Sequence, residues 1–202
     1  LVKVVAVGTG QAIRNAKNCD GDLLIVHSKV AETAFVKSGF GIERFDLMYN
    51  DFIIIGPKSD PANLKTSTNI KDIFYKVSSG KHTFVSRGDD SGTHKKELQL
   101  WQKSFINPKP GSGSWYLEVG AGMGTALNIA AEVNGYILTD RASWLSFKNK
   151  QDLSILYEKD KNLFNQYGII VVDPEKCIKN NYREATILSE WLRSRKGQAS
   201  IK

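Results

Sequence analysis

The stretch 87–94, which reads Arg-Gly-Asp-Asp-Ser-Gly-Thr-His, joins a predicted strand to a predicted helix. Ser91, Gly92 and Thr93 would lie at the helix start, where backbone N–H groups have no intrahelical acceptor and the dipole favours a negative ligand. Gly92 allows close approach of the backbone, and Arg87 adds a guanidinium that matches pairs of oxygen atoms. The stretch therefore predicts a site for a small oxyanion, although Ser91 could equally serve only as the N-cap while Arg87 pairs with a neighbouring Asp.

Two further glycine-rich turns precede predicted helices, at 7–10 (Val-Gly-Thr-Gly) and at 120–125 (Gly-Ala-Gly-Met-Gly-Thr). Each would present N–H groups at a helix N-terminus, so three such turns could converge on one anion, although glycine turns also serve close packing. Neither matches the dinucleotide-binding fingerprint, because Ile13 stands where the third glycine belongs. No Lys-Ser or Lys-Thr pair follows a glycine loop, so nucleotide binding is disfavoured.

Strand-like apolar runs alternate with amphipathic helical patterns along the chain, which predicts an α/β protein with parallel sheets. We expect strands at 2–7, 22–27, 47–56, 83–86, 136–138, 153–156 and 168–172. We expect helices from Gln11, at 29–37, from 70 to Gly80, and at 91–105, 123–133, 141–147 and 182–193. Asn69 and Asp140 are suitable N-caps, and Gly39 suits a left-handed C-terminal cap. The run 47–56 is interpreted as a crossing between two lobes.

The composition is that of a globular protein. The chain has 202 residues, of which 41% are hydrophobic and 24% charged, which excludes disordered and collagen-like chains and allows one large domain or two small ones. Apolar runs such as 23–26 are far shorter than the roughly 18 residues that a membrane span requires. A net charge of +7 favours an anionic partner. Cys19 and Cys177 are too few for a disulfide scaffold or a zinc site, and whether they pair stays open.

The spacing of the candidate catalytic residues disfavours an enzyme active site. A serine hydrolase would need Gly-x-Ser-x-Gly, and Gly88 lies one position too far from Ser91. Asp89 and Asp90 could form a carboxylate pair, but adjacent residues rarely face one point, and a turn explains them equally well. No His-Glu-x-x-His pattern is present, and the three isolated histidines are His27, His82 and His94.

Nucleic-acid binding is also disfavoured. Lys and Arg are spread along the sequence rather than gathered in a patch, which is typical of a solvated surface. The four Trp residues lie in apolar contexts, so we expect core positions for Trp101, Trp115, Trp144 and Trp191.

Several motifs, in order along nearly the whole chain, resemble the tungstate-binding proteins of bacterial ABC importers. They lie at 7–12, 48–52, 87–94, 122–124 and 138–142. The resemblance implies a type II periplasmic-binding-protein fold, in which two α/β lobes are joined by two crossing strands and close on an oxyanion in the cleft. Lobe 1 would be discontinuous, with residues 1–56 and 166–202, and lobe 2 would be 57–165. The first strand and helix of lobe 1 would be missing, because the sequence begins after them.

The resemblance also implies the ligand set and the partners. The residues that would bind the anion are Arg87, Ser91, Gly92, Thr93, Thr9, Gly122, Met123, Gly124 and Thr125. The ligand would be tungstate, or possibly molybdate, handed to an ABC importer permease from the periplasm or from a membrane-tethered extracellular position. Neither catalysis, a cofactor nor a metal site is expected. The alternatives are a phosphate-binding protein of the same superfamily, with Asp89 or Asp90 accepting the phosphate proton, and an anion-sensing protein outside transport.

Overall fold

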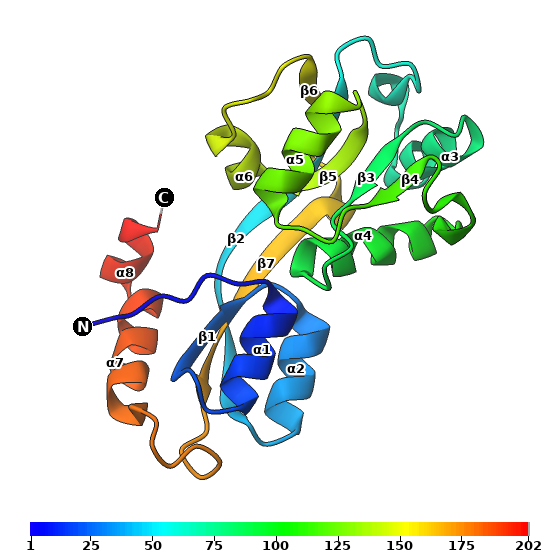
Figure 1. The fold of residues 1–202 in the computed structure, drawn as a ribbon. Helices are drawn as coiled ribbons and strands as arrows, with labels where there is room; N and C mark the ends of the chain where they lie inside the picture. Colours follow the sequence, from blue (N-terminus) through cyan, green and yellow to red (C-terminus); the bar gives the residue numbers. More distant parts are fainter. Residues whose placement is uncertain (202) are drawn as a thin grey trace. The chain divides into compact units, whose positions relative to one another are not determined.

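The computed structural model describes residues 1–201, which fall into two compact units (Figure 1). The first unit contains Leu1–Tyr49 and the chain from Gln166 onward, and the second contains Asn50–Asn165. The expected lobes had their first boundary at residue 56, close to the end of β2 (Gly41–Pro57), whereas the units divide between Tyr49 and Asn50, near its middle. Because β2 is a single long strand, no turn marks the boundary in the sequence.

In the first unit, β1 (Leu23–Val26) pairs antiparallel with β7 (Phe164–Val172), and β7 is also the neighbour of β2. Buried apolar side chains from the sheet and from the first two helices form one core, made of Ala16, Leu24, Val26, Phe35, Ile170, Val172 and Cys177. The helices of this unit are α1 (Thr9–Lys17), α2 (Lys29–Lys37), α7 (Tyr182–Arg193) and α8 (Arg195–Ser200). Of these, α8 has no counterpart among the predicted helices.

In the second unit, alternate residues of β2 face two different cores. Phe52 and Ile54 pack against α3 (Ile70–Ser79) and α4 (Gly92–Lys103), whereas Ile53 and Ile55 pack against α5 (Met123–Glu132) and α6 (Arg141–Ser146). Side chains alternate across a strand, so a strand buried on both faces reads as the continuous apolar run seen here. Short 3-10 helices complete the unit at Leu64–Thr66, Lys109–Gly111 and Lys161–Leu163.

The sheet of the second unit is mixed, so the expectation of parallel sheets was only partly right. β3 (Phe84–Ser86) is parallel to β4 (Tyr116–Glu118) and to β5 (Tyr136–Asp140), but β5 and β6 (Leu153–Tyr157) both pair antiparallel with β2. Alternation of strands and helices cannot show the direction of β2, because that strand enters from the other unit. The three parallel strands end at one edge, from which α4, α5 and α6 begin.

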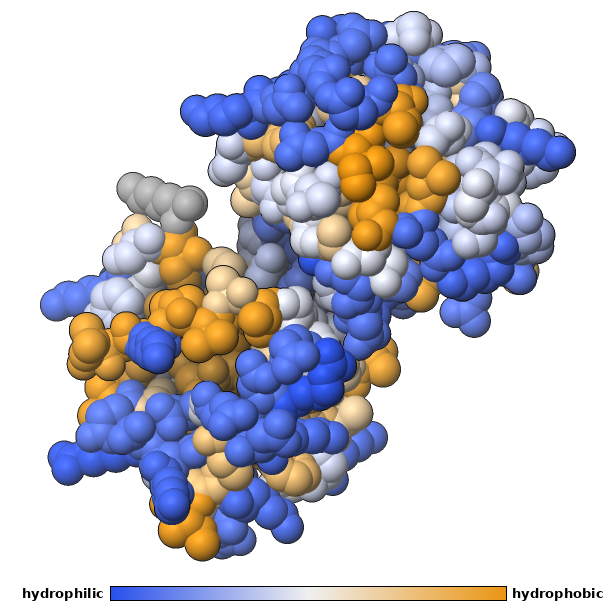
Figure 2. Space-filling model, viewed as in Figure 1, coloured by the Kyte–Doolittle hydropathy of each residue, from blue (hydrophilic) through white to orange (hydrophobic). Residues whose placement is uncertain are grey.

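The expected strand at 2–7 is wrong. No residue of 1–8 is assigned to a strand, and Leu1, Val2, Val4 and Val5 are largely exposed. A strand exists only through its hydrogen-bonding partner, and none of the described strands pairs with this segment. Figure 2 shows apolar surface in this part of the first unit. Trp191 on α7 was expected in the core and is 46% exposed.

Local capping signals were right. The side chain of Asn69 accepts a hydrogen bond from the Asp72 N–H, and that of Asp140 accepts one from the Ser143 N–H. Each satisfies a backbone donor that the first helical turn leaves unpaired. Gly39 follows α2 with φ +75°, the left-handed conformation in which glycine has no steric penalty.

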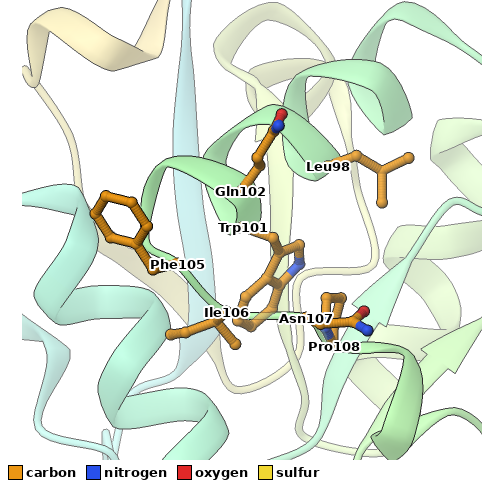
Figure 3. A pocket seen from close by; sticks show the side chains of 7 residues that line it. All are labelled: Leu98, Trp101, Gln102, Phe105, Ile106, Asn107 and Pro108. Carbon is orange, nitrogen blue, oxygen red and sulfur yellow. The ribbon is translucent and has the colours of Figure 1, made fainter.

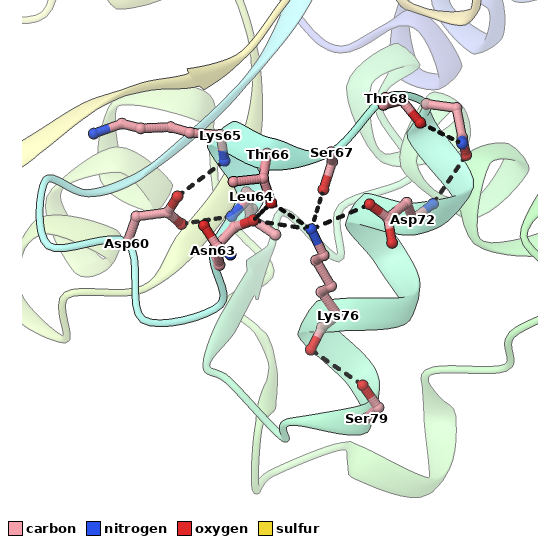
Figure 4. Close-up of polar contacts among 11 residues, drawn as sticks. Asp60, Asn63, Leu64, Lys65, Thr66, Ser67, Thr68, Asp72, Lys76 and Ser79 are labelled. Atoms are coloured by element: carbon pink, nitrogen blue, oxygen red, sulfur yellow. Dashed lines mark hydrogen bonds and ion pairs between the residues drawn. The ribbon is translucent and has the colours of Figure 1, made fainter.

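A polar network fixes the segment between β2 and α3 (Figure 4). Asp60 accepts hydrogen bonds from the N–H groups of Leu64 and Lys65, each at 2.9 Å. The ammonium of Lys76 on α3 donates to the Asn63 carbonyl at 3.0 Å and to the Ser67 hydroxyl at 2.9 Å. The segment therefore packs as part of the second unit.

Cys19 and Cys177, left open by the sequence, form a disulfide in the first unit. It joins the end of α1 to the chain between β7 and α7, positions separated by 158 residues. Among residues 1–201 no free cysteine remains. A cross-link over so long a loop restricts the unfolded chain strongly.

We expect the double substitution Cys19→Ser with Cys177→Ser to lower the free energy of unfolding by about 3–5 kcal/mol, because the unfolded ensemble regains the entropy of a long loop. Urea denaturation of the variant beside the oxidised wild type measures the difference. Reduced wild type is the control and should behave as the variant does. Equal midpoints for oxidised and reduced wild type would contradict a stabilising bridge.

Candidate functional site

The stretch 87–91 connects the end of β3 to the start of α4. Ser91 is the N-cap of α4, and its hydroxyl oxygen accepts a hydrogen bond from the His94 N–H at 3.2 Å. The capping interpretation of Ser91 is therefore right. It does not exclude ligand binding, because the first turn of a helix has four N–H groups without an intrahelical acceptor and this cap satisfies one of them. Ser91 is 1% and Thr93 3% exposed.

Arg87 is held in place by two groups of the same unit. Its Nη2 pairs with the Asp89 carboxylate, and its Nε donates to the Ala121 carbonyl at 3.4 Å. The side chain is only 14% exposed, so the guanidinium does not extend into bulk water. Nη1 has no hydrogen-bond acceptor in the described part of the chain. Nη1 of Arg87 is therefore available to donate a hydrogen bond to a ligand.

Asp89 accepts hydrogen bonds from two neighbouring residues. Its Oδ1 accepts the Ser91 N–H at 3.2 Å, while Oδ2 accepts from Arg87. Burial opposes ionisation, but the hydrogen bonds from Ser91 and the positive charge of Arg87 together lower the pKa of Asp89 below its usual value. The carboxylate is therefore ionised at neutral pH and serves as the counter-ion of Arg87. Its neighbour Asp90 pairs with Lys95 instead.

A second helix start lies beside this loop. The Ala121 N–H donates to the Arg87 carbonyl at 3.2 Å, and the Val119 N–H donates to the Ser86 carbonyl at 3.0 Å. These bonds extend the β3–β4 pairing beyond the strands and hold the 119–122 turn against Arg87. The structure thus brings together two of the three predicted glycine-rich elements, 87–94 and 120–125.

The helices differ in whether an acidic side chain lies in the first turn, where it would compensate the positive end of the helix dipole. α2, α3 and α7 carry Glu32, Asp72 and Glu184 in their first turns. α1, α4 and α5 carry no acidic residue there, and α1 and α5 also begin at a glycine with no side-chain cap. The positive ends of these helices are not compensated by an acid in their first turns, which favours an external anion.

Thr9, the predicted contact of the first unit, begins α1 after the N-cap Gly8. It is 2% exposed, and its hydroxyl has no hydrogen-bond partner within residues 1–201. A buried hydroxyl without a partner costs stability, so its presence at a helix start points to a ligand. Thr9 and Arg87 belong to different units, so that they share one ligand stays a prediction.

Two pockets of the second unit lie away from these residues. One, of about 390 Å³, is formed where α4 ends and the following loop begins, and it is lined by Leu98, Trp101, Gln102, Phe105, Ile106, Asn107 and Pro108 (Figure 3). The other, of about 580 Å³, is lined by Asn69, Ile70, Lys71, Lys103, Phe105 and Asn162. None of the predicted site residues lines either pocket, and the first has no charged side chain.

Sequence reasoning missed two residues of this region. His94 was interpreted as isolated, but its Nδ1 accepts the Asp90 N–H at 3.1 Å and so fixes the turn. Burial lowers the pKa of His94, so the ring is neutral at pH 7. Glu97 carries no motif, and only its position on the buried face of α4 could have signalled it. Among the described residues no group of three or more His, Cys, Asp or Glu could hold a metal, and no helix is long and apolar enough to span a membrane.

Comparisons with known proteins agree on one family. The sequence model of the PBP superfamily domain matches residues 2–196. The tungstate-binding protein TupA of Peptoclostridium acidaminophilum is 49% identical over 201 residues, which are 98% of this chain and 69% of that protein. The crystal structure of the tungstate ABC transporter from Geobacter sulfurreducens superposes with a TM-score of 0.87 at 43% identity, covering 97% of this chain and 82% of that one. TupA from Desulfovibrio alaskensis G20 gives 0.81 at 44% identity, covering 98% and 80%.

The unpaired hydroxyl of Thr9 gives a stability prediction. Thr9→Val replaces that hydroxyl with a methyl group of similar size, so the free energy of unfolding should stay unchanged or rise by about 1 kcal/mol. Thr139→Val is the matched control, because Thr139 is equally buried but its hydroxyl donates to the Asp140 carbonyl at 3.2 Å. That variant should lose about 1 kcal/mol in urea denaturation. Equal losses in both variants would show that Thr9 has a partner.

Proposed function

The chain belongs to the PBP superfamily, and we propose that it binds a fully ionised tetrahedral oxyanion, tungstate foremost, for delivery to an ABC importer. The relatives that are named tungstate-binding proteins, at 49% and 42% identity, support this ligand. The observation that carries the proposal is the position of Arg87, largely shielded from water and paired with Asp89, beside the N-termini of α4 and α5.

Binding in this site needs no bond to change. A dianion loses its hydration at a cost of several kcal/mol, and neutral donors with one guanidinium replace the water. The donors of the second unit are Arg87 Nη1, the first N–H groups of α4 and α5, and the hydroxyls of Thr93 and Thr125. We also assign the Thr9 hydroxyl to oxyanion binding, on the basis of its unpaired, buried side chain.

The two carboxylates of the 87–91 stretch already have donors of their own, which supports tungstate or molybdate over phosphate. Phosphate keeps a proton near neutral pH, and that proton needs an acceptor inside the site. Asp89 accepts from Arg87 and Ser91, and Asp90 from Lys95, so the two carboxylates that could have taken this role are engaged. Tungstate and molybdate carry no proton at neutral pH, so they bring no O–H donor that would need an acceptor in the site.

Two features support a position outside the cytoplasm. Disulfides such as Cys19–Cys177 form and persist in oxidising compartments, among them the bacterial periplasm. The similar proteins of known structure include one titled as the tungstate ABC transporter from Geobacter sulfurreducens, and an importer takes up its ligand from outside the cytoplasm. The partners in this proposal are the anion and an importer permease, and the chain acts by capture and release rather than by catalysis.

Titration calorimetry at pH 7.5 should give tight one-to-one binding of tungstate, similar or weaker binding of molybdate, and phosphate binding weaker by about 10- to 100-fold or more. The factor follows from the cost of one unpaired phosphate proton. Competition in mixtures of the anions provides the check. Phosphate displacing tungstate would contradict the assignment, and a folded chain that binds none of these anions would contradict oxyanion capture itself.

Arg87→Ala should weaken tungstate binding by about 100-fold, because it removes charge-assisted hydrogen bonds and leaves the Asp89 carboxylate facing the anion without its counter-ion. Arg87→Lys should recover only part of this loss, since a point charge cannot reproduce the planar fork. Arg183→Ala removes the same charge from the exposed side of α7 and should bind as the wild type does. Undiminished affinity in Arg87→Ala would exclude this site.

A further inference from the structure

Glu97 is a buried carboxyl group without a cationic partner. It lies on α4, is 2% exposed, and forms an ion pair with no Lys, Arg or His of the described chain. Its Oε1 accepts hydrogen bonds from the Tyr116 hydroxyl at 2.7 Å and from the Trp101 indole N–H at 3.0 Å. The hydroxyl of Ser86 faces the same carboxyl. A buried acid in such surroundings changes protonation easily when a charge nearby changes.

Glu97 is close to the proposed anion site through two elements. It follows Gly92 on the same helix, and at about 1.5 Å per residue the two positions are roughly 7–8 Å apart along the axis. Ser86, which faces the carboxyl, is the residue directly before Arg87. Ser91 and Thr93 at the start of α4 are buried, as is Glu97, so a charge bound there would act on Glu97 with less screening than in water.

The other groups around Glu97 do not compensate its charge. Glu118 on β4 also faces it, and hydrogen bonds from Lys109 and Ser112 lower the pKa of Glu118, so that this neighbour is negative. Burial and the charge of Glu97 raise the pKa of Tyr116, which therefore keeps its proton and donates.

Three other elements that contact α4, namely α3, β2 and β5, present no charged side chain to Glu97 within the described residues. α3 presents the apolar side chains of Ile73, Phe74 and Val77. On β5, Asp140 caps α6, and the Tyr136 hydroxyl is hydrogen-bonded to Asp60 and Ala62 instead.

We propose that Glu97 is the proton-linked residue of this protein, taking up one proton from solvent when a doubly charged oxyanion binds at the start of α4. The inference rests on the proposed function. Binding places two negative charges near a carboxylate that has no counter-ion, and protonation of Glu97 removes the repulsion. The same linkage requires that ionisation of Glu97 weaken the anion's affinity.

The pKa of Glu97 in the free protein sets the pH range over which proton uptake is expected. Burial raises the pKa of Glu97 to about 7, only partly offset by its hydrogen-bond donors. Repulsion from the bound anion raises it further, so uptake occurs between the two pKa values, above pH 7. As pH rises through this range, the free protein ionises at Glu97 first, and affinity falls. Tungstate stays a dianion throughout, so the ligand itself contributes no proton.

The test is titration calorimetry of the wild type with sodium tungstate in two buffers of different ionisation enthalpy. At pH 7.5 we expect uptake of about 0.3–0.8 proton per anion, and we expect affinity to fall by about tenfold from pH 7 to pH 9. Glu97→Gln should bind tungstate without this uptake and hold its affinity within about twofold over the same range. His94→Gln is the control for the other titratable group near the site and should keep the wild-type uptake.

Tyr116→Phe provides a second variant if Glu97→Gln does not fold. It removes a donor that stabilises the Glu97 carboxylate, so the fall in affinity should move to higher pH. Wild type that binds tungstate with no proton uptake, or Glu97→Gln with undiminished uptake, would overturn the inference while leaving oxyanion binding intact. An unshifted pH profile in Tyr116→Phe would overturn it equally. If the wild type binds no tungstate between pH 7 and pH 9, the proposed function and this inference fail together.

Discussion

The parallel pairing of β3 with β4 is the constraint on which the candidate site depends. Hydrogen bonds continue past the ends of both strands, from Val119 to Ser86 and from Ala121 to Arg87. Two chain segments that are about thirty residues apart in sequence are thereby held side by side where each enters a helix. A helix start alone is a weak anion site, and two starts fixed against one guanidinium form a much stronger one.

The positions of two acidic residues in the second unit, Asp89 and Glu97, are equally important. Asp89 uses both carboxylate oxygens on Arg87 and Ser91, which orients the guanidinium and removes the acceptor that a protonated ligand would need. Glu97 sits deeper, where it meets donors but no cation. We therefore expect the two acids to respond to an anion in different ways: Arg87 keeps Asp89 ionised, whereas no cation holds Glu97 in its ionised form.

The first unit contributes a different kind of evidence. Its core is small, and the Cys19–Cys177 bridge joins α1 to the chain beyond β7, so the helix that begins at Thr9 is tied covalently at its other end. The buried Thr9 hydroxyl then stands at a fixed position without a partner. Such a group is costly in a chain that binds nothing and useful in one that binds an oxyanion.

The sequence by itself determined the local structure. Helix bounds at 29–37 and 182–193, the caps at Asn69 and Asp140, and the role of Ser91 as N-cap all follow from side chains acting on their own neighbours in the chain. Motif order was equally readable, and it indicated the family that the comparisons show. These features need only short-range physics, because capping and helical periodicity involve residues a few positions apart.

Only the tertiary structure decided the rest. It showed that 2–7 is not a strand, that Trp191 lies at the surface, that the second sheet is mixed, and that the two cysteines pair. It also paired Asp89 with Arg87, and it buried Glu97 on α4. Each of these depends on which distant segment becomes the neighbour. An extended apolar run, a thiol or a carboxylate looks the same in sequence whether or not a partner is present, since pairing and burial are properties of the folded chain.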